Sequence, residues 1–147
     1  MNRSMQALLP TAVLLASLAM PPLLYAGDET SNDVDKISVT AAKDYVAEHA
    51  DAVILDVRTP VEYELSHITG AINLDVQNDS FESLAAGLDR NKTYLVHCTR
   101  NPENGRSMRA LATLQSLGFK NLYSLEGGYV AWKDAALPLT EAENRPE

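Results

Sequence analysis

The sequence predicts an α/β domain in which a parallel sheet carries helices on both faces. Short apolar runs rich in β-branched residues alternate along the chain with segments of helical periodicity. Strands that are connected through helices pair in parallel, because each crossover returns the chain to the same end of the sheet. The length of 147 residues, with 46% hydrophobic and 22% charged residues, fits one such domain. It excludes a disordered chain, a collagen-like repeat and a two-domain enzyme.

Four short segments carry the strand signal. Residues 52–56 (AVILD) and 93–97 (TYLVH) are mostly apolar runs, which are typical of strands buried on both faces. Residues 71–74 and 122–124 are shorter segments of the same kind. The segment 93–97 ends directly before Cys98, so this cysteine is expected at the carboxyl end of a strand.

Helix signals stand between these strands. Thr40 is the expected N-cap of the first helix, whose apolar face begins at Ala42. Pro60 suits the first turn of a short helix that ends at Glu64. The remaining helices are expected at 81–88, 105–117 and 129–135.

Charge and cysteine content exclude several classes of protein. Twenty Asp and Glu residues outnumber twelve Lys and Arg residues, which gives a formal net charge of −8. Nucleic-acid binding rests on clustered basic side chains, so no nucleic-acid partner is expected. The single cysteine, Cys98, excludes an intramolecular disulfide and a paired-cysteine metal site. The three histidines and Cys98 also lack metal-ligand spacing, so no metal site is expected.

The first 26 residues have the features of a secretory signal peptide. Arg3 provides a short positive segment, residues 7–20 are mostly apolar, and Ala26 offers a small residue at a cleavage site. The alternative is an uncleaved membrane anchor, although Pro10 interrupts the apolar stretch and a spanning helix needs roughly 20 residues. The expected protein is therefore periplasmic or secreted, without stable membrane insertion after cleavage.

The rest of the chain divides into three parts. Residues 27–36 are polar and acidic and are expected to form a flexible lead-in. The folded domain is expected to span residues 37–139, and residues 140–147 are expected to form a C-terminal tail.

Cys98 stands between a strand and a helix, which is where ligands bind in open parallel sheets. The amide groups at a helix N-terminus attract anions and favour a nucleophilic thiolate over a thiol. Arg100, Arg106 and Arg109 also gather near Cys98 in an otherwise acidic chain. These features predict an anion site with a nucleophilic cysteine. The alternative is that Cys98 is a small buried residue at a strand end, a common place for a free cysteine.

Three segments of the chain resemble the single-domain rhodanese family. They are LDVRTPVEYELSHITGAINL (55–74), VHCTRNPENGRS (96–107) and LYSLEGGYVAWKDAALP (122–138). The first departs from the family pattern at Ser66 and the third at Ala136, where a glycine is usual. The resemblance covers nearly all of residues 37–139.

The resemblance implies a five-stranded parallel sheet and a sulfurtransferase that needs neither a metal nor an organic cofactor. Cys98 would accept a sulfane sulfur from a small anionic donor such as thiosulfate or polysulfide. The resulting persulfide would pass the sulfur to a thiol or cyanide acceptor. The candidate substrate-binding residues, which form the loop after the cysteine, are Thr99, Arg100, Asn101, Glu103, Asn104, Gly105 and Arg106.

Further residues of the matching segments are expected to support the site. The resemblance implies that Asp56 and Arg58 are mainly structural and orient the loop through hydrogen bonds. His67 belongs to the same segment and is expected to be a structural imidazole. Strand alternation points the side chain of His97 to the face opposite that of Cys98, which argues against a direct role as a base.

The loop departs from the family pattern in its length. The family loop usually runs Cys-x-x-Gly-x-Arg-Ser, whereas here the loop ends in Gly105-Arg106-Ser107 and has three extra residues between Cys98 and Arg106. Arg106 takes the place of the loop-closing arginine and is expected to contact the anion or, alternatively, to pair with a carboxylate.

Since a longer loop makes a wider or differently folded cradle, two alternatives to an exported sulfurtransferase stay open. One is phosphatase-like or arsenate-reductase-like chemistry at Cys98, with Glu103 as proton donor. The other is a sulfur-carrier or binding module without turnover.

Overall fold

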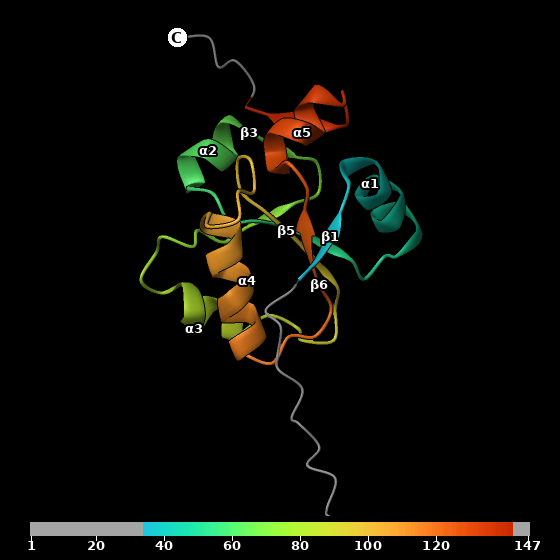
Figure 1. Ribbon diagram of the computed structural model, residues 1–147. Helices are drawn as coiled ribbons and strands as arrows, with labels where there is room; N and C mark the ends of the chain where they lie inside the picture. The colour runs from blue at the N-terminus through green and yellow to red at the C-terminus, as the bar shows by residue number, and fades with distance from the viewer. Residues whose placement is uncertain (1–33, 143–147) are drawn as a thin grey trace, which may run out of the picture. The chain divides into compact units, whose positions relative to one another are not determined.

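The computed structural model describes residues 34–142 (Figure 1). The signal peptide expected at 1–26 lies outside this range, as do most of the expected lead-in and residues 143–147. Within the described range, no helix is both long enough and apolar enough to cross a bilayer.

Within residues 34–142, seven strands form two sheets. The larger sheet contains β1 (Asp35–Ile37), β2 (Val53–Asp56), β4 (Ile72–Asn73), β5 (Tyr94–His97) and β6 (Leu122–Leu125). Its order is β1-β6-β5-β2-β4, and every neighbouring pair is parallel. The smaller sheet is an antiparallel pair of β3 (Ser66–Ile68) and β7 (Leu139–Glu141).

Five helices are described, each close to a segment in which the sequence predicts one. They are α1 (Val39–Glu48), α2 (Pro60–Leu65), α3 (Phe81–Ala86), α4 (Arg106–Ser116) and α5 (Gly128–Asp134). The predicted α/β fold class with a five-stranded parallel sheet is confirmed.

Two apolar clusters cover the two faces of the larger sheet. On one face, Phe81 of α3 and Leu111 of α4 pack with Leu55 and Val96 of the central strands. Figure 1 shows α3 and α4 together on this side and α1 on the other side. Burial of these side chains is the main force that holds the helices to the sheet.

On the other face, the second cluster joins α1 and α5 to the same strands. Ala42 of α1 and Trp132 of α5 pack with Ile54 and Leu95, which are the chain neighbours of Leu55 and Val96. Consecutive residues of a strand point to opposite faces, so each central strand supplies both clusters. The predicted helices on both faces are therefore confirmed.

The strands β1, β3 and β7 are not predicted by the sequence pattern, because each has three residues and little apolar signal. Asp35 and Lys36, expected in the flexible lead-in, belong to β1 and pair with β6. Thr140 and Glu141, expected in the C-terminal tail, belong to β7 and pair with β3. The paired strands therefore extend two residues beyond each expected end of the domain, residues 37 and 139.

At the N-termini of α1 and α2, side-chain hydrogen bonds determine where the helix begins. The N-cap of α1 is Ser38, whose hydroxyl accepts the backbone N–H of Ala41 at 3.3 Å. The prediction of Thr40 as N-cap is wrong, because this residue lies inside the first turn. At α2, the Thr59 hydroxyl accepts the Glu62 N–H and the Glu62 carboxylate accepts the Thr59 N–H. This capping box fixes the side chain of Glu62.

Candidate active site

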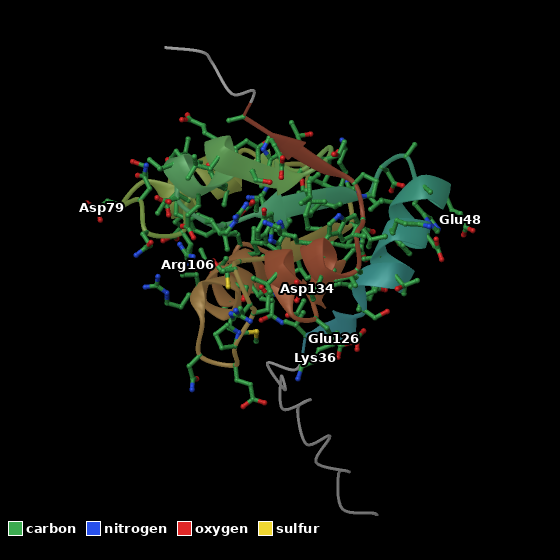
Figure 2. All side chains as sticks on the ribbon, turned by 90° about the horizontal axis from the view of Figure 1, so that it is seen from above. Lys36, Glu48, Asp79, Arg106, Glu126 and Asp134 are labelled. Atoms are coloured by element: carbon green, nitrogen blue, oxygen red, sulfur yellow. The ribbon has the colours of Figure 1, made fainter. Side chains whose placement is uncertain are left out.

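Cys98 directly follows β5, at the edge of the sheet where the parallel strands end. β5 lies between β2 and β6, so the ends of three adjacent strands meet around this cysteine. The loop from Cys98 then leads to α4, which begins at Arg106. Figure 2 shows Arg106 on the side of the domain that also carries Asp79. This is the place predicted for a ligand site.

The sulfur of Cys98 is nearly buried and surrounded by hydrogen-bond donors. The residue is 3% exposed, and its Sγ lies 3.6 Å from the Ser107 hydroxyl oxygen. Burial alone raises the pKa of the thiol. However, hydrogen bonds from the Ser107 hydroxyl and from the backbone N–H groups of Ser107, Asn101 and Arg100 outweigh burial and lower the pKa below its ordinary value. The site therefore favours a thiolate.

This lowered pKa predicts the pH dependence of the thiol. A free cysteine titrates at about pH 8.5, and Cys98 should titrate at lower pH. The stability that the thiolate adds to the folded state is present above the unfolded-state pKa and is lost as the pH falls through the folded-state pKa. Ultraviolet absorbance of the thiolate, with the Cys98→Ser variant as blank, measures the midpoint directly. A midpoint above that of free cysteine would contradict the assigned donors.

The N-terminus of α5 holds the first residues of the loop. The Tyr129 N–H donates to the Cys98 carbonyl and the Val130 N–H donates to the Thr99 carbonyl, each at 3.0 Å. In a trans peptide the N–H points away from the C=O, so these bonds turn the N–H of Arg100 away from α5. That N–H is one of the groups that donate to the Cys98 sulfur. The helix α5 therefore positions the donors of the site.

Close contact between α5 and the loop requires a glycine at position 128. Gly128 has φ +60°, and a Cβ atom there would lie 2.6 Å from the Cys98 carbonyl oxygen and 3.0 Å from the Thr99 carbonyl oxygen. Gly127 precedes it in the left-handed region, with φ +68°. The pair Gly127-Gly128 thus allows the backbone of α5 to approach the loop.

Gly128→Ala should therefore disturb both the fold and the site. Gly70→Ala is the matched control, since Gly70 has φ +84° but nothing within 4 Å of an added Cβ. The control should lose about 1–2 kcal/mol of the free energy of unfolding, because a residue with a Cβ atom is strained in the left-handed region. Gly128→Ala should lose more free energy of unfolding, because the added Cβ also displaces the Cys98 carbonyl. Urea denaturation measures both variants; equal losses, together with an unchanged thiol pKa, would contradict the close approach.

Arg106 is held by the carboxylate of Glu62, which was not among the predicted site residues. Its Nη1 donates to Glu62 Oε2 at 2.6 Å, and its Nη2 donates to Glu62 Oε1 at 2.8 Å. Nη2 also donates to the Thr99 hydroxyl at 2.9 Å, and that hydroxyl donates to Glu62. The hydrogen bonds from Arg106 hold the pKa of Glu62 far below its ordinary value, against the opposing effect of partial burial. Of the two roles expected for Arg106, the structure shows the ion pair with a carboxylate, which is that of Glu62.

A second ion pair is buried beneath the loop. Arg58 Nη2 donates to Asp56 Oδ2 at 2.6 Å, and both side chains are almost completely buried. Arg58 also donates to the Ser66 carbonyl and lies over the Tyr129 ring at 4.1 Å from its centroid. Because Tyr129 holds the Cys98 carbonyl, the pair supports the loop from below.

His97 joins this buried pair to the loop. Asp56 and His97 are register partners on β2 and β5, and His97 Nε2 lies 3.7 Å from Asp56 Oδ2. Burial lowers the pKa of His97, although Asp56 and the Cys98 carbonyl act in the opposite direction. The imidazole is therefore neutral at neutral pH. Nδ1 carries its proton, because it lies 3.0 Å from the Cys98 carbonyl oxygen, which can only accept.

The remaining predicted residues lie at the edge of the site or outside it. Arg100, Glu103 and Asn104 are exposed in the loop, and Arg109 is exposed one turn further along α4. His67 stacks on Tyr63 and its Nδ1 lies 2.8 Å from the Tyr63 carbonyl oxygen. These contacts give His67 a local structural role in the α2–β3 segment.

Three residues of the site were not selected from the sequence. Glu62 carries a local signal, the capping box with Thr59, but its pairing with a residue 44 positions away carries none. Ser107 follows the loop-closing arginine and contacts the thiol from the first turn of α4. Gly128 has a signal in the Gly-Gly pair, which marks a place where the backbone needs room.

The fold and the site together define a class of α/β domain. A thiol stands at the carboxyl end of a central parallel strand, and the amides of a loop that leads into a helix surround it. The chain belongs to the rhodanese family, because the model of the rhodanese-like domain matches residues 38–135.

Several relatives are named for sulfur transfer. Thiosulfate sulfurtransferase GlpE of Pseudomonas fluorescens is 35% identical over 96 residues, which cover 65% of this chain and 83% of that protein. The chloroplastic thiosulfate sulfurtransferase 16 of Arabidopsis thaliana is 32% identical over 120 residues, which cover 75% of this chain and 96% of that protein. An uncharacterised protein of Synechocystis is 41% identical over 99 residues, and the match spans about half of its length (51%).

Solved structures show the same fold. The rhodanese-like domain of the Alr3790 protein from Anabaena superposes with a TM-score of 0.65 at 25% identity, covering 78% of this chain and 85% of that one. A protein from Lactobacillus plantarum superposes with a TM-score of 0.62 at 30% identity, covering 72% of this chain and 87% of that one. These neighbours agree with the five-stranded parallel sheet.

Proposed function

We propose that the chain is a sulfurtransferase that carries sulfur as a persulfide on Cys98. The observation that carries this proposal is the nearly buried thiol of Cys98, whose pKa is lowered by hydrogen bonds from the Ser107 hydroxyl and from the amides of Ser107, Asn101 and Arg100. Membership of the rhodanese-like family and the similarity to proteins named thiosulfate sulfurtransferase support the same chemistry.

The proposed reaction has two displacements at sulfur. The Cys98 thiolate attacks the sulfane sulfur of thiosulfate, a new sulfur–sulfur bond forms, and the old one breaks to release sulfite with its electron pair. The persulfide carries the single negative charge that the thiolate had. An acceptor such as cyanide or a thiolate then attacks the outer sulfur, which releases the transferred sulfur and regenerates the Cys98 thiolate. The amides around the sulfur stabilise the negative charge in both steps.

The site favours a small anionic donor. An exposure of 3% leaves little room at the sulfur, so a compact donor such as thiosulfate or the end of a polysulfide chain fits best. Arg106 supplies a positive charge near Cys98, and Glu62 offsets that charge. The balance of these two charges should therefore set the affinity for the donor.

Opposite changes of this charge balance should have opposite effects on the Michaelis constant for thiosulfate. Glu62→Gln removes the negative charge and should lower KM by about two- to fivefold, the size of a partly exposed charge interaction. Arg106→Gln leaves Glu62 uncompensated and should raise KM. Steady-state rates over a range of thiosulfate concentrations measure both. If both variants raise KM equally, the pair acts through its geometry and not through charge.

We also propose that the protein is exported and that the loop of this chain is a lengthened form of the family loop. The signal-peptide features of residues 1–26 support export, and the three extra residues between Cys98 and Arg106 support the second point. Phosphate or arsenate chemistry has weaker support. Glu103 is exposed, and Glu62 is held in its ionised form by Arg106, so it cannot donate a proton.

The proposed function is tested by turnover with alternative donors. The purified protein should form thiocyanate and sulfite from thiosulfate and cyanide, or transfer sulfur from polysulfide. It should not hydrolyse an aryl phosphate or reduce arsenate. Hydrolysis of the phosphate without sulfur transfer would overturn the proposal. A persulfide that forms but never turns over with cyanide or thiols would mean that the chain is a sulfur carrier instead.

A further inference from the structure

The side chain of Asn101 turns away from solvent and enters the space between the loop and the sheet. Its Oδ1 accepts the backbone N–H of Cys98 at 2.6 Å. Its Nδ2 donates to the Val96 carbonyl at 3.0 Å and to the Ser124 hydroxyl at 3.3 Å. Both ends of the carboxamide are therefore used inside the protein, so Asn101 is poorly placed to bind substrate through this group.

The groups that hold Asn101 belong to the rigid part of the fold. Val96 and Ser124 are register partners on the adjacent parallel strands β5 and β6, and both are buried. Gly128 of α5 lies on the third side, since a Cβ at Gly128 would be 3.0 Å from Asn101 Oδ1. The carboxamide thus connects the loop to two strands and packs beside the N-terminus of α5.

The backbone of Asn101 explains why this residue type stands here. Its φ of 48° lies in the left-handed region, which asparagine tolerates better than most residues other than glycine. This conformation and the bond from the Cys98 N–H close the loop on itself, so Asn101 returns to the residue that begins the turn. The same turn places the N–H groups of Arg100 and Asn101 at the Cys98 sulfur.

We propose that Asn101 is the positioning residue of Cys98, whose carboxamide fastens the loop to β5 and β6 and so aims the amides of Arg100 and Asn101 at the sulfur. This inference rests on the proposed role of Cys98 as the nucleophile. Without the carboxamide, the Cys98 N–H loses this acceptor, the Val96 carbonyl loses one donor, and the turn can relax away from the sulfur.

The charged groups of the loop itself, Arg100 and Glu103, are exposed, and the charged groups packed around Cys98 are paired and are not altered by a change at Asn101. Arg106 of α4 is paired with Glu62 of α2, and on the other side of the strand Arg58 is paired with Asp56 next to the neutral His97. A change in the titration of Cys98 in Asn101 variants therefore reports on the amide donors.

The decisive variant is Asn101→Gly, because glycine keeps the left-handed backbone and removes only the side chain. The midpoint of the Cys98 thiolate titration should rise by about one pH unit, and at a pH below both midpoints the transfer rate should fall about tenfold in proportion to the thiolate. At a pH above the new midpoint the rate should return to that of the unchanged protein. Asn121→Ala, a change at an exposed asparagine between α4 and β6, is the control and should alter neither value.

The outcomes separate this inference from the proposed function. A titration midpoint that is unchanged in Asn101→Gly, or a rate that is lowered equally at every pH, would overturn the inference. If Asn101→Gly does not fold by circular dichroism, Ser124→Ala removes one partner of Asn101 Nδ2 without adding a charge, and its midpoint must also rise. The titration needs no sulfur donor, so a shifted midpoint in a protein that forms no persulfide would leave the inference standing and overturn the proposed function.

Discussion

Replacing Cys98 by serine should reduce sulfur transfer to background, a loss of about a thousandfold or more. A serine hydroxyl is not ionised at neutral pH, and its oxygen cannot form a persulfide. The change is small in volume and the residue is 3% exposed, so the fold should persist. The rate of thiocyanate formation measures the loss, and urea denaturation confirms the folded state. Because Cys98 is the single cysteine, sulfur transfer that survives in this variant cannot proceed through a cysteine persulfide and would contradict the mechanism.

Arg58→Ala should have the largest effect on stability. The change leaves the carboxylate of Asp56 buried and without its partner at 2.6 Å, and breaking a buried ion pair in this way costs about 3–5 kcal/mol of the free energy of unfolding. It also removes the bond to the Ser66 carbonyl and the contact with the Tyr129 ring. Urea denaturation measures the loss.

Two further variants show whether the loss comes from an uncompensated buried charge. The double variant Asp56→Asn/Arg58→Ala removes both charges and should recover a large part of the stability. Lys43→Ala breaks the exposed pair of Lys43 with Asp44 and should change the free energy of unfolding by no more than about 0.5 kcal/mol. A double variant as unstable as Arg58→Ala would show that the lost packing dominates and not the charge of Asp56.

The fold could be predicted from the sequence wherever burial leaves a pattern. The central strands β2 and β5 are apolar runs because helices cover both of their faces, and the predicted ranges agree with the structure to one residue. β1 left no such pattern, since it is a three-residue edge strand with two exposed polar residues. Its place is decided by pairing with β6, which is a contact between distant parts of the chain.

The site could be predicted where the chemistry is local. Cys98 at the end of a strand and Arg106 at the start of a helix are neighbours along the chain, so their approach follows from the predicted elements. The pairing of Arg106 with Glu62 depends on how α2 packs beside the loop. The inward turn of Asn101 depends on a single left-handed residue, which no pattern of hydrophobicity reports. Residues that act through tertiary contacts therefore had to come from the structure.

The intact mass of the purified protein after exposure to thiosulfate tests the central claim most directly. The account predicts a gain of one sulfur atom on Cys98, which cyanide reverses and which the Cys98→Ser variant does not show. A protein that gains no sulfur from thiosulfate or from polysulfide, while its thiolate titrates at lower pH than free cysteine, would contradict the persulfide mechanism.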